Sequence, residues 1–362
     1  MNRNILTASI AAASLLLSAD ALAAKLKVPA QYGTIQAAVD AANPFDVIEI
    51  AKGKYEETVD IVMKNDLKIV GDGKVVIDGS GGGGSIFFID DSESIRLKNL
   101  VLKNGTRGVH TDSSEKVIIE DVVVKNTNLS GIWLESSANV RIIDSSIMDV
   151  GTIGIAIYAS LGCHVEETEI KRTTTAGIEV SGSQNTIVDC EIEEAGTNGI
   201  RLGEGGSGAH GTLVIGNKVV NPTYDCLSIG DGSSSTSVLG NSFKGGDEGI
   251  YVISGCHDQL VDDNSFRQNN GHGMELNAQG LTISRNRVKK SGANGIYIRS
   301  GGDFGLYHQN SVKKAHTNGF HVYGTGNALH QNKGKDCSGF DLNDTTLPGQ
   351  NVFSGNSFDT VN

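Results

Sequence analysis

The 362-residue sequence is poor in proline and in aromatic residues. It has 4 prolines, 1 tryptophan and an aromatic content of 5%, whereas glycine occurs 47 times. Proline removes a backbone donor from a strand, and glycine supplies the positive φ angles of tight turns. The composition therefore favours many short strands joined by turns. Collagen is excluded, because the glycines follow no three-residue period.

Positive charge is also scarce. The chain has 30 Lys and Arg residues against 42 Asp and Glu residues, a formal net charge of −12. A nucleic-acid-binding protein needs a basic surface, so we expect no nucleic acid partner. The excess of acidic residues by itself indicates only a soluble protein.

The cysteines are few and odd in number. Cys163, Cys190, Cys226, Cys256 and Cys337 leave at least one thiol unpaired in a monomer. Their positions do not match between neighbouring repeats of the kind described below, so we predict buried free thiols and no stacked disulfides.

The chain has one long apolar run, at its start. Arg3 precedes an apolar stretch over 5–17, and Ala21-Leu22-Ala23 fits the small-residue rule for cleavage. These features predict a signal peptide over 1–23 and a mature chain from Ala24. The stretch is short for a membrane span and no later one is long enough. We therefore expect an exported protein, periplasmic or extracellular, without membrane insertion.

A short helix is expected next, because Ile35, Ala38, Val39 and Ala42 recur at helical spacing. Thr34 is a suitable N-cap, and Asn43-Pro44 ends the helix. Short strands are expected over 47–50, 59–62, 67–70 and 75–77, before a glycine-rich loop over 79–85.

This opening carries a family resemblance. Residues 34–42, then 46–50, then Gly53 and Tyr55 resemble the start of pectin-lyase-like β-helix proteins. In those proteins the helix caps the open end of a stack of coils. The resemblance implies that fold, and it is shared by proteins of many activities and of none.

From residue 108 the chain repeats a Gly-apolar-x-apolar unit, mostly at intervals of 22 to 24 residues. The units start at Gly108, Gly131, Gly154, Gly177, Gly199, Cys226, Gly249, Gly273, Gly295, Gly319 and Gly339. A fixed period of about 23 residues with alternation inside each strand predicts a solenoid of stacked β coils. We therefore predict an all-β, single-domain parallel β-helix. It has a cap helix and first coils over 24–85 and repeats over 86–362, and the resemblance implies a right-handed one.

A second unit lies between the first ones and ends on a polar residue. Its members are Asn99, Asp121, Asp144, Thr168, Cys190, Asn217, Asn241, Asn264, Asn286, Asn310, Asn332 and Asn356. Asparagines stacked in neighbouring coils can hydrogen-bond to one another. We interpret this column as a structural ladder.

Side chains two and four positions after each glycine point away from the core. In the later repeats these outward positions are rich in Tyr, Arg and His. We predict that the following residues bind substrate: Arg201, Tyr251, Glu275, Tyr297, Arg299, His321 and Tyr323. Tyrosine rings offer flat faces to sugars, and arginine offers a fork to carboxylates.

The position before the glycine holds Asp225, Glu248 and His272 in three consecutive repeats, with Asp247 beside Glu248. Stacked coils bring such groups to about 5 Å from one another at the backbone. Crowded carboxylates raise one another's pKa, so that one stays protonated near neutral pH. A general acid beside a general base is the pair that glycosidic hydrolysis needs. We predict these four residues as catalytic.

At these residues the chain resembles polygalacturonase-type glycoside hydrolases. Thr223-Tyr224-Asp225, Asp247-Glu248, Gly271-His272-Gly273 and 296–299 stand where that family has Asn-Thr-Asp, Asp-Asp, Gly-His-Gly and Arg-Ile-Lys. The resemblance implies that Glu248 is the acid, that Asp225 and Asp247 position water, that His272 orients the site and that Arg299 holds a substrate carboxylate. The family has Asp where Glu248 stands and Arg where Tyr297 stands.

Two other functions stay open. A polyuronate lyase or epimerase needs a cation at the uronate carboxylate (Arg299, Arg201 or Ca²⁺) and a proton acceptor such as His272, Tyr251 or Tyr297. The Asp-Pro-His-Asp motif of alginate epimerases does not occur. The third hypothesis is a non-catalytic glycan-binding or structural β-helix protein.

We predict no cofactor and no metal site. Asp72, Asp78, Asp90 and Asp91 flank the glycine-rich loop without a recognisable Ca²⁺-binding spacing. His308 and His330 occupy the same position in adjacent repeats, one that the strand alternation predicts to point inward. We therefore favour a stacked, hydrogen-bonded pair of rings over a metal site. Nothing in the sequence indicates oligomerisation, so we expect a monomer.

Overall fold

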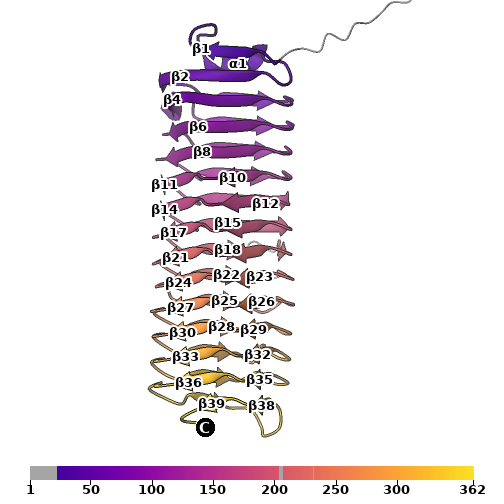
Figure 1. Cartoon of the computed structure of the whole chain (residues 1–362), viewed down its shortest axis with the longest axis vertical. Helices are drawn as coiled ribbons and strands as arrows, with labels where there is room; N and C mark the ends of the chain where they lie inside the picture. Colours follow the sequence, from indigo (N-terminus) through magenta and orange to yellow (C-terminus); the bar gives the residue numbers. More distant parts are fainter. Residues whose placement is uncertain (1–22, 204–206, 231) are drawn as a thin grey trace, which may run out of the picture.

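The structure, a computed structural model, describes residues 23–203, 207–230 and 232–362. The chain winds into a long rod of stacked coils, with the helix α1 at one end and the C-terminus at the other (Figure 1). Every strand pairing is parallel, which confirms the predicted parallel β-helix. The predicted signal peptide lies outside the described residues, apart from its last position.

The N-terminal end is closed by α1 (Ile35–Ala41). The Thr34 hydroxyl accepts a hydrogen bond from the backbone N–H of Ala37 at 3.1 Å, so the predicted N-cap is confirmed. Ile35, Ala38 and Val39 are buried against the first coils. A strand that the sequence did not predict, β1 (Lys25–Val28), pairs with β2 beside the helix.

One sheet carries the Gly-apolar-x-apolar units, and its strands stack in chain order. They are β3 (Val59–Val62), β5 (Phe87–Asp90), β7 (Val109–Asp112), β9 (Ile132–Glu135), β12 (Ile155–Leu161), β15 (Ile178–Ser183), β18 (Ile200–Leu202), β22 (Leu227–Ile229), β25 (Ile250–Val252), β28 (Met274–Leu276), β31 (Ile296–Ile298), β34 (Phe320–Val322) and β37 (Leu342–Asp344), with β19 (Ala209–His210) beside β15. We call this the unit sheet.

The other sheet closes each coil. Its first strands are long: β2 (Val47–Tyr55), β4 (Lys68–Asp78), β6 (Arg96–Lys103) and β8 (Ile118–Lys125). Later coils split this strand in two: β10 (Arg141–Ile143) and β11 (Ser146–Val150), β13 (His164–Glu166) and β14 (Glu169–Thr173), β16 (Thr186–Val188) and β17 (Glu191–Glu193), β20 (Leu213–Ile215) and β21 (Lys218–Val220), β23 (Ser237–Leu239) and β24 (Ser242–Lys244), β26 (Leu260–Asp262) and β27 (Ser265–Arg267), β29 (Thr282–Ser284) and β30 (Arg287–Lys289), β32 (Leu306–His308) and β33 (Ser311–Lys313), β35 (Ala328–His330) and β36 (Lys333–Lys335), β38 (Val352–Ser354) and β39 (Ser357–Phe358). The glycine-rich loop contains the short 3₁₀ helix η1 (Gly79–Gly81).

The glycine that starts most units is required by close packing. A Cβ atom on Gly131 would lie 2.4 Å from the Ile147 side chain and 2.7 Å from the carbonyl oxygen of Gly154 in the next coil. The two apolar positions after it, Ile132 and Leu134, are fully buried. Stacking identical positions in this way buries a continuous apolar core that no single coil can form.

The last coil is shifted by two residues from the predicted frame. Phe320 pairs with Leu342, so Asp341 and not Gly339 takes the glycine position, and Phe340 is 40% exposed. The Asp341 carboxylate accepts hydrogen bonds from the backbone N–H groups of Asp359 and Thr360. These bonds to the end of the chain hold the strand in the shifted register.

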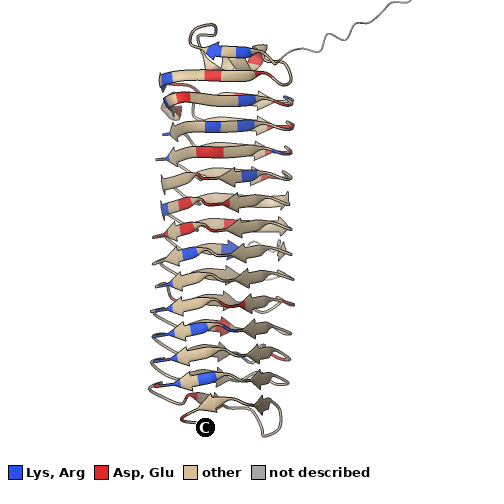
Figure 2. Cartoon of the chain, viewed as in Figure 1, with Lys and Arg blue, Asp and Glu red and all other residues tan. Residues whose placement is uncertain are grey.

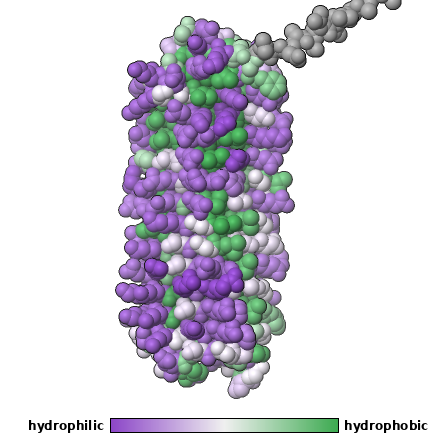
Figure 3. All heavy atoms as spheres, viewed as in Figure 1, coloured by the Kyte–Doolittle hydropathy of each residue, from purple (hydrophilic) through white to green (hydrophobic). Residues whose placement is uncertain are grey.

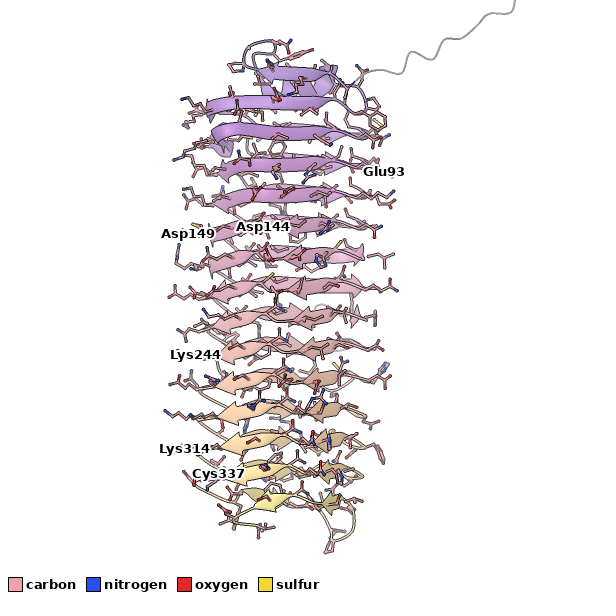
Figure 4. The ribbon with its side chains drawn as sticks, in the orientation of Figure 1. Glu93, Asp144, Asp149, Lys244, Lys314 and Cys337 are labelled. Carbon is pink, nitrogen blue, oxygen red and sulfur yellow. The ribbon has the colours of Figure 1, made fainter. Side chains whose placement is uncertain are left out.

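The asparagine ladder is confirmed from Asn217 to Asn356. Each side-chain amide donates to the Oδ1 atom of the next asparagine, at 2.9 to 3.2 Å. The prediction is wrong by one position for Asn99, Asp121 and Asp144, which are exposed and have positive φ; Asn99 and Asp121 interrupt the regular backbone inside β6 and β8, and Asp144 lies in the bend between β10 and β11. Asp144 is labelled in Figure 4; the buried ladder position beside it is Ser145, whose Oγ accepts from the Val122 N–H at 3.2 Å.

The five cysteines are thiols outside disulfide bonds, as predicted. Four are buried, and Cys337, near the C-terminal end of the rod in Figure 4, is partly exposed. The His308 and His330 rings stack with centroids 5.6 Å apart, which confirms the pair. However, they face outward, because strand alternation buries Tyr307. The hydrogen bond of His330 goes to Ser354 and not to His308.

Asp78 is satisfied by cationic side chains. It lies 3.0 Å from Lys103 and 3.3 Å from Lys54, and Asn104 donates to it at 3.0 Å. Burial alone would raise its pKa, but the hydrogen bonds from Asn104, Lys103 and Ser80 outweigh burial and hold the pKa well below its usual range. The ammonium groups of Lys103 and Lys54 therefore occupy the space beside the Asp78 carboxylate that a bound Ca²⁺ would need.

Surface charge is uneven along the rod. Five consecutive coils carry a basic residue at one register position, namely Lys244, Arg267, Lys289, Lys313 and Lys335. Figure 2 shows Lys and Arg gathered at one edge of the lower coils, and Figure 3 shows a mostly hydrophilic face with apolar patches along its middle. The described residues contain no helix with the length and apolar character needed to cross a membrane.

Replacing Asn286 by Ala should destabilise the protein by about 3 kcal/mol. The Asn286 side chain accepts from the N–H and the amide of Asn264 and donates to Val261 and Asn310. Its loss leaves these buried groups unsatisfied. Chemical unfolding monitored by circular dichroism measures the effect. The exposed Asn128→Ala variant is the control, and equal stability of the two variants would contradict a ladder that stabilises the fold.

Candidate functional site

Three of the four predicted catalytic residues occupy the same position on neighbouring coils. Asp225, Glu248 and His272 each come two residues before the first strand residue of β22, β25 and β28, and these strands pair directly. The glycine or cysteine between each residue and its strand packs against the core. The side chains therefore share one edge of the unit sheet, one coil apart.

Asp225 and Glu248 form a hydrogen-bonded carboxyl pair. Asp225 is 8% exposed; it accepts from the Glu248 backbone N–H at 3.3 Å and from the Asn198 amide at 3.1 Å. Burial, the hydrogen bond to Asp225 and the charges of nearby acids raise the pKa of Glu248 to about 8. Burial and the charge of Asp247 also raise the pKa of Asp225. The pair therefore holds a proton at neutral pH, mainly on Glu248.

Asp247 reaches the same place from the solvent side. A Cβ atom on Gly271 would lie 2.6 Å from Oε1 of Glu248 and 3.0 Å from Oδ1 of Asp247. Both carboxyl groups thus occupy the space that a side chain at residue 271 would fill. Asp247 is exposed and Glu248 is partly buried. This gives the first glycine of the Gly-His-Gly sequence a direct role in shaping the site.

His272 is a neutral hydrogen-bond donor. Its Nδ1 accepts the backbone N–H of Asn294 at 3.1 Å, so the proton of the neutral ring is on Nε2. Nε2 lies 3.6 Å from Oε2 of Glu275. Burial, with a further contribution from the charge of Arg299, lowers the pKa of His272 to about 4. The ring therefore presents an N–H group toward the carboxyl cluster at neutral pH.

Glu275 and Arg299 form an ion pair at the centre of the predicted binding surface. Arg299 Nε lies 2.6 Å from Oε1 of Glu275, whose side chain is 9% exposed, while that of Arg299 is 44% exposed. Burial raises the pKa of Glu275, and the positive charge of Arg299 opposes that shift. One side of the Arg299 guanidinium group thus pairs with Glu275, and the other side faces solvent.

Aromatic rings continue from the cluster toward the C-terminus. Tyr297 lies between His272 and His321, with ring centroids 4.7 and 5.4 Å away, and Tyr323 packs edge-on at 5.9 Å. The Arg299 guanidinium lies 5.6 Å from the centroid of the Tyr297 ring. The structure therefore brings together these residues with the carboxyl cluster, and it places Tyr251 one strand from Glu275.

Arg201 is not part of this cluster. It lies two coils before Tyr251 in the register of the unit sheet and makes an ion pair with the buried Glu179, to which Tyr158 also donates. Because the Arg201 guanidinium pairs with Glu179, this arrangement does not support the predicted binding of a substrate carboxylate by Arg201.

Sequence reasoning missed two supporting residues. Asn198 donates to Asp225, and the backbone of Asn294 fixes the tautomer of His272. Both occupy the same column position as the catalytic candidates, one coil to either side of them. Their place in this column is visible in the sequence, but the hydrogen bonds that give them a role are not.

A metal ion fits the cluster poorly. Ligand atoms of Glu248, His272 and Glu275 lie within 4.8 Å of one another, which is the one such group in the described parts of the chain. Metal binding requires an unprotonated ring nitrogen. Because Nδ1 already accepts an N–H, Nε2 carries the ring proton and cannot be a ligand without loss of a second proton. The two carboxylates of this group by themselves supply at most four of the six to eight oxygen ligands that Ca²⁺ takes.

Fold and site together define a parallel β-helix with a carboxyl-rich cluster on the outer face of one sheet. The sequence matches the family model for the right-handed β-helix region over residues 85–243 and 227–335. The chain belongs to this right-handed β-helix family, which confirms the handedness implied by the resemblance. A comparison with curated proteins finds no significant match.

Solved structures with the same fold differ in what they do. The chain is similar to the A-module of the mannuronan C-5 epimerase AlgE4 of Azotobacter vinelandii (16% identity, TM-score 0.63, 89% of this chain and 95% of that chain). It is also similar to PfbA, a surface adhesin of Streptococcus pneumoniae (12%, 0.65, 90% and 93%), and to the tailspike receptor binding domain of Siphovirus 9NA (12%, 0.68, 92% and 76%). At these identities the likeness shows the fold and not the activity.

The raised pKa of Glu248 makes stability depend on pH. The folded state holds a proton that the unfolded state releases above pH 4.5, so this contribution is complete below that value and is lost as pH rises to about 8. We expect the wild-type protein to lose about 1–2 kcal/mol relative to Glu248→Gln between pH 5 and 8, after allowance for partial exposure. Chemical unfolding of both proteins across this range measures the difference, and a constant difference would contradict the shift.

Proposed function

We propose that this is an exported carbohydrate-active protein that hydrolyses glycosidic bonds of an acidic, uronate-containing polysaccharide. The observation that carries the proposal is the crowding of three carboxyl groups at one edge of the unit sheet, where Glu248, whose pKa is raised to about 8, lies beside the buried Asp225 and the exposed Asp247. A carboxyl group that keeps its proton near neutral pH, next to one that does not, is the arrangement that general acid and base catalysis of glycoside cleavage requires.

The roles follow from exposure and charge. Glu248 donates its proton to the glycosidic oxygen as the bond from that oxygen to the anomeric carbon breaks. Asp247, the more exposed carboxylate, accepts a proton from the water whose oxygen bonds to the anomeric carbon. Asp225 orients the Glu248 proton before transfer. The products are a reducing sugar and a free hydroxyl group, and no proton is left unaccounted for.

The neighbouring residues suit an acidic sugar. The neutral His272 offers an N–H donor, the Tyr297 ring offers a flat face, and the outer side of the Arg299 guanidinium offers charge to a uronate carboxylate. Tyr251, His321 and Tyr323 extend this surface along the rod. The predicted signal peptide supports a periplasmic or extracellular location, where such polymers occur.

Cleavage by elimination, or epimerisation, is the second candidate, and the likeness in fold to the A-module of a mannuronan C-5 epimerase favours it. Such chemistry needs a base to remove a carbon-bound proton. Burial raises the pKa of both Tyr251 and Tyr297, and burial lowers that of His272 to about 4, which makes each a weak or protonated base near neutral pH. We therefore rank hydrolysis first.

Incubation of the mature protein with pectic and alginate polymers separates these functions. Hydrolysis produces new reducing ends without unsaturated ends, whereas a lyase produces unsaturated ends and an epimerase changes the uronate composition. With hydrolysis as the readout, Glu248→Gln should lower kcat at least about 100-fold, because it removes the general acid. The exposed Glu93→Gln is the matched control. Unchanged activity of Glu248→Gln would refute the acid role.

The pH profile gives an independent check. Glu248 acts only when protonated, so kcat/KM should fall as pH rises through about 8. Initial rates at low substrate concentration, between pH 5 and 10, measure this limb. A profile that is flat or rising from pH 7 to 9 would show that the catalytic acid is another group.

A further inference from the structure

A second group of aromatic side chains lies on the outer face of the unit sheet, toward the N-terminal end. Phe88, His110 and Trp133 occupy one register position on β5, β7 and β9. Tyr158 of β12 packs on Trp133, and the Arg107 guanidinium lies over the Trp133 ring. We call Phe88, His110, Trp133, Tyr158 and Arg107 the aromatic platform.

The contacts of the platform are close and ordered. The Trp133 and Tyr158 ring centroids are 4.7 Å apart, and Phe88 and His110 are 5.0 Å apart. The Arg107 guanidinium lies 4.6 Å from the centroid of the Trp133 ring. The Trp133 indole N–H donates to Glu135 at 3.1 Å, which fixes the orientation of the ring. The platform is therefore held in place before any ligand arrives.

Core packing does not explain these residues. The inward positions on the same strands, such as Val109, Ile132 and Leu134, already fill the core. The platform residues alternate with them and are partly exposed. The solvent face of a sheet is ordinarily polar, and aromatics make up 5% of this chain, with Trp133 its one tryptophan.

The chemistry of the platform fits sugar rings that carry acid groups. Aromatic faces bear negative partial charge and attract the C–H groups of a flat ring laid on them. Arg107 supplies a cation beside that face, and arginine binds carboxylates through paired N–H groups. Burial lowers the pKa of His110, so its ring is a neutral partner at neutral pH.

The platform continues into the candidate site. Trp133, Ala156, Glu179, Arg201, Ser228 and Tyr251 follow one another in register on consecutive strands of the unit sheet. Five coil steps separate Trp133 from Tyr251, which is roughly 24 Å at about 4.8 Å per coil. Between them lie the small Ala156 and Ser228 and the paired Glu179 and Arg201. A linear polymer along this column would contact both regions.

We propose that the aromatic platform is a second binding site for the acidic polysaccharide, which holds the chain about five coils from the bond that reacts. This rests on the function proposed above, from which it takes the polymer class. The platform makes long chains better substrates than short ones, because only chains that span both regions gain its contacts.

The emission of Trp133 tests the proposal directly, since it reports on the platform alone. Polygalacturonate and alginate are titrated into the Glu248→Gln protein, which retains the platform, with neutral dextran as the control polymer. We expect a saturable change in emission with an acidic polymer and none with dextran. Calorimetry of the same mixtures detects binding anywhere on the protein. Binding by calorimetry with unchanged emission would overturn the proposal.

Variants give a second readout. Trp133→Ala should weaken binding of the acidic polymer about tenfold or more, and Arg107→Gln should weaken it while retaining Trp133 emission. Phe304→Ala, which removes another exposed aromatic ring away from the unit sheet, should have no effect. Equal affinity of Trp133→Ala and the unsubstituted protein would also overturn the proposal.

The outcomes separate this proposal from the proposed catalysis. Hydrolysis without an emission change leaves the catalytic proposal standing and removes the platform. An emission change without hydrolysis in the protein that retains Glu248 leaves the platform standing and removes the catalytic proposal. Absence of both binding and hydrolysis with these polymers removes both.

Discussion

The parallel register between coils is the constraint on which the rest of the structure depends. Each strand hydrogen-bonds to the same segment of the next coil, so residues about 23 positions apart come to lie about 4.8 Å apart. Asn217, Asn241 and their successors become a ladder in this way, and Asp225, Glu248 and His272 become neighbours. One geometric rule therefore builds both the hydrogen-bonded asparagine ladder and the crowded group of carboxyl side chains.

The two columns differ in how their polar groups are satisfied. In the ladder, each buried asparagine has partners above, below and on the backbone. In the candidate site, the like-charged Asp225 and Glu248 are placed together at partial burial, and one of them must keep a proton. In a structural column, every polar group keeps its hydrogen bonds throughout the neutral pH range. A column in which one carboxyl group has a pKa near 8 destabilises the fold but supplies a proton donor for catalysis. This contrast is our reason for treating the second column as functional.

Much of this could be predicted from the sequence. The cap helix with Thr34, the parallel coils, the free thiols and the adjacency of Asp225, Glu248 and His272 all follow from local patterns. Errors arose where two turn residues compete for one place, as with Asp144 and Ser145, and at Gly339, where the repeat pattern gave way to contacts with the end of the chain. The spacing of residues along the sequence predicts neither outcome, because each depends on which side chain hydrogen-bonds to a backbone group far away in the chain.

The sequence by itself determined the period, the alternation and hence which residues share a column, because a parallel solenoid converts chain spacing directly into position. Only the tertiary structure decided what each column member does. It paired Arg299 with Glu275 and Arg201 with Glu179, set the proton of His272 on Nε2, and packed Arg107 over Trp133. These outcomes depend on side-chain direction and burial across neighbouring coils. The repeat length fixes the spacing between those coils but leaves such details open.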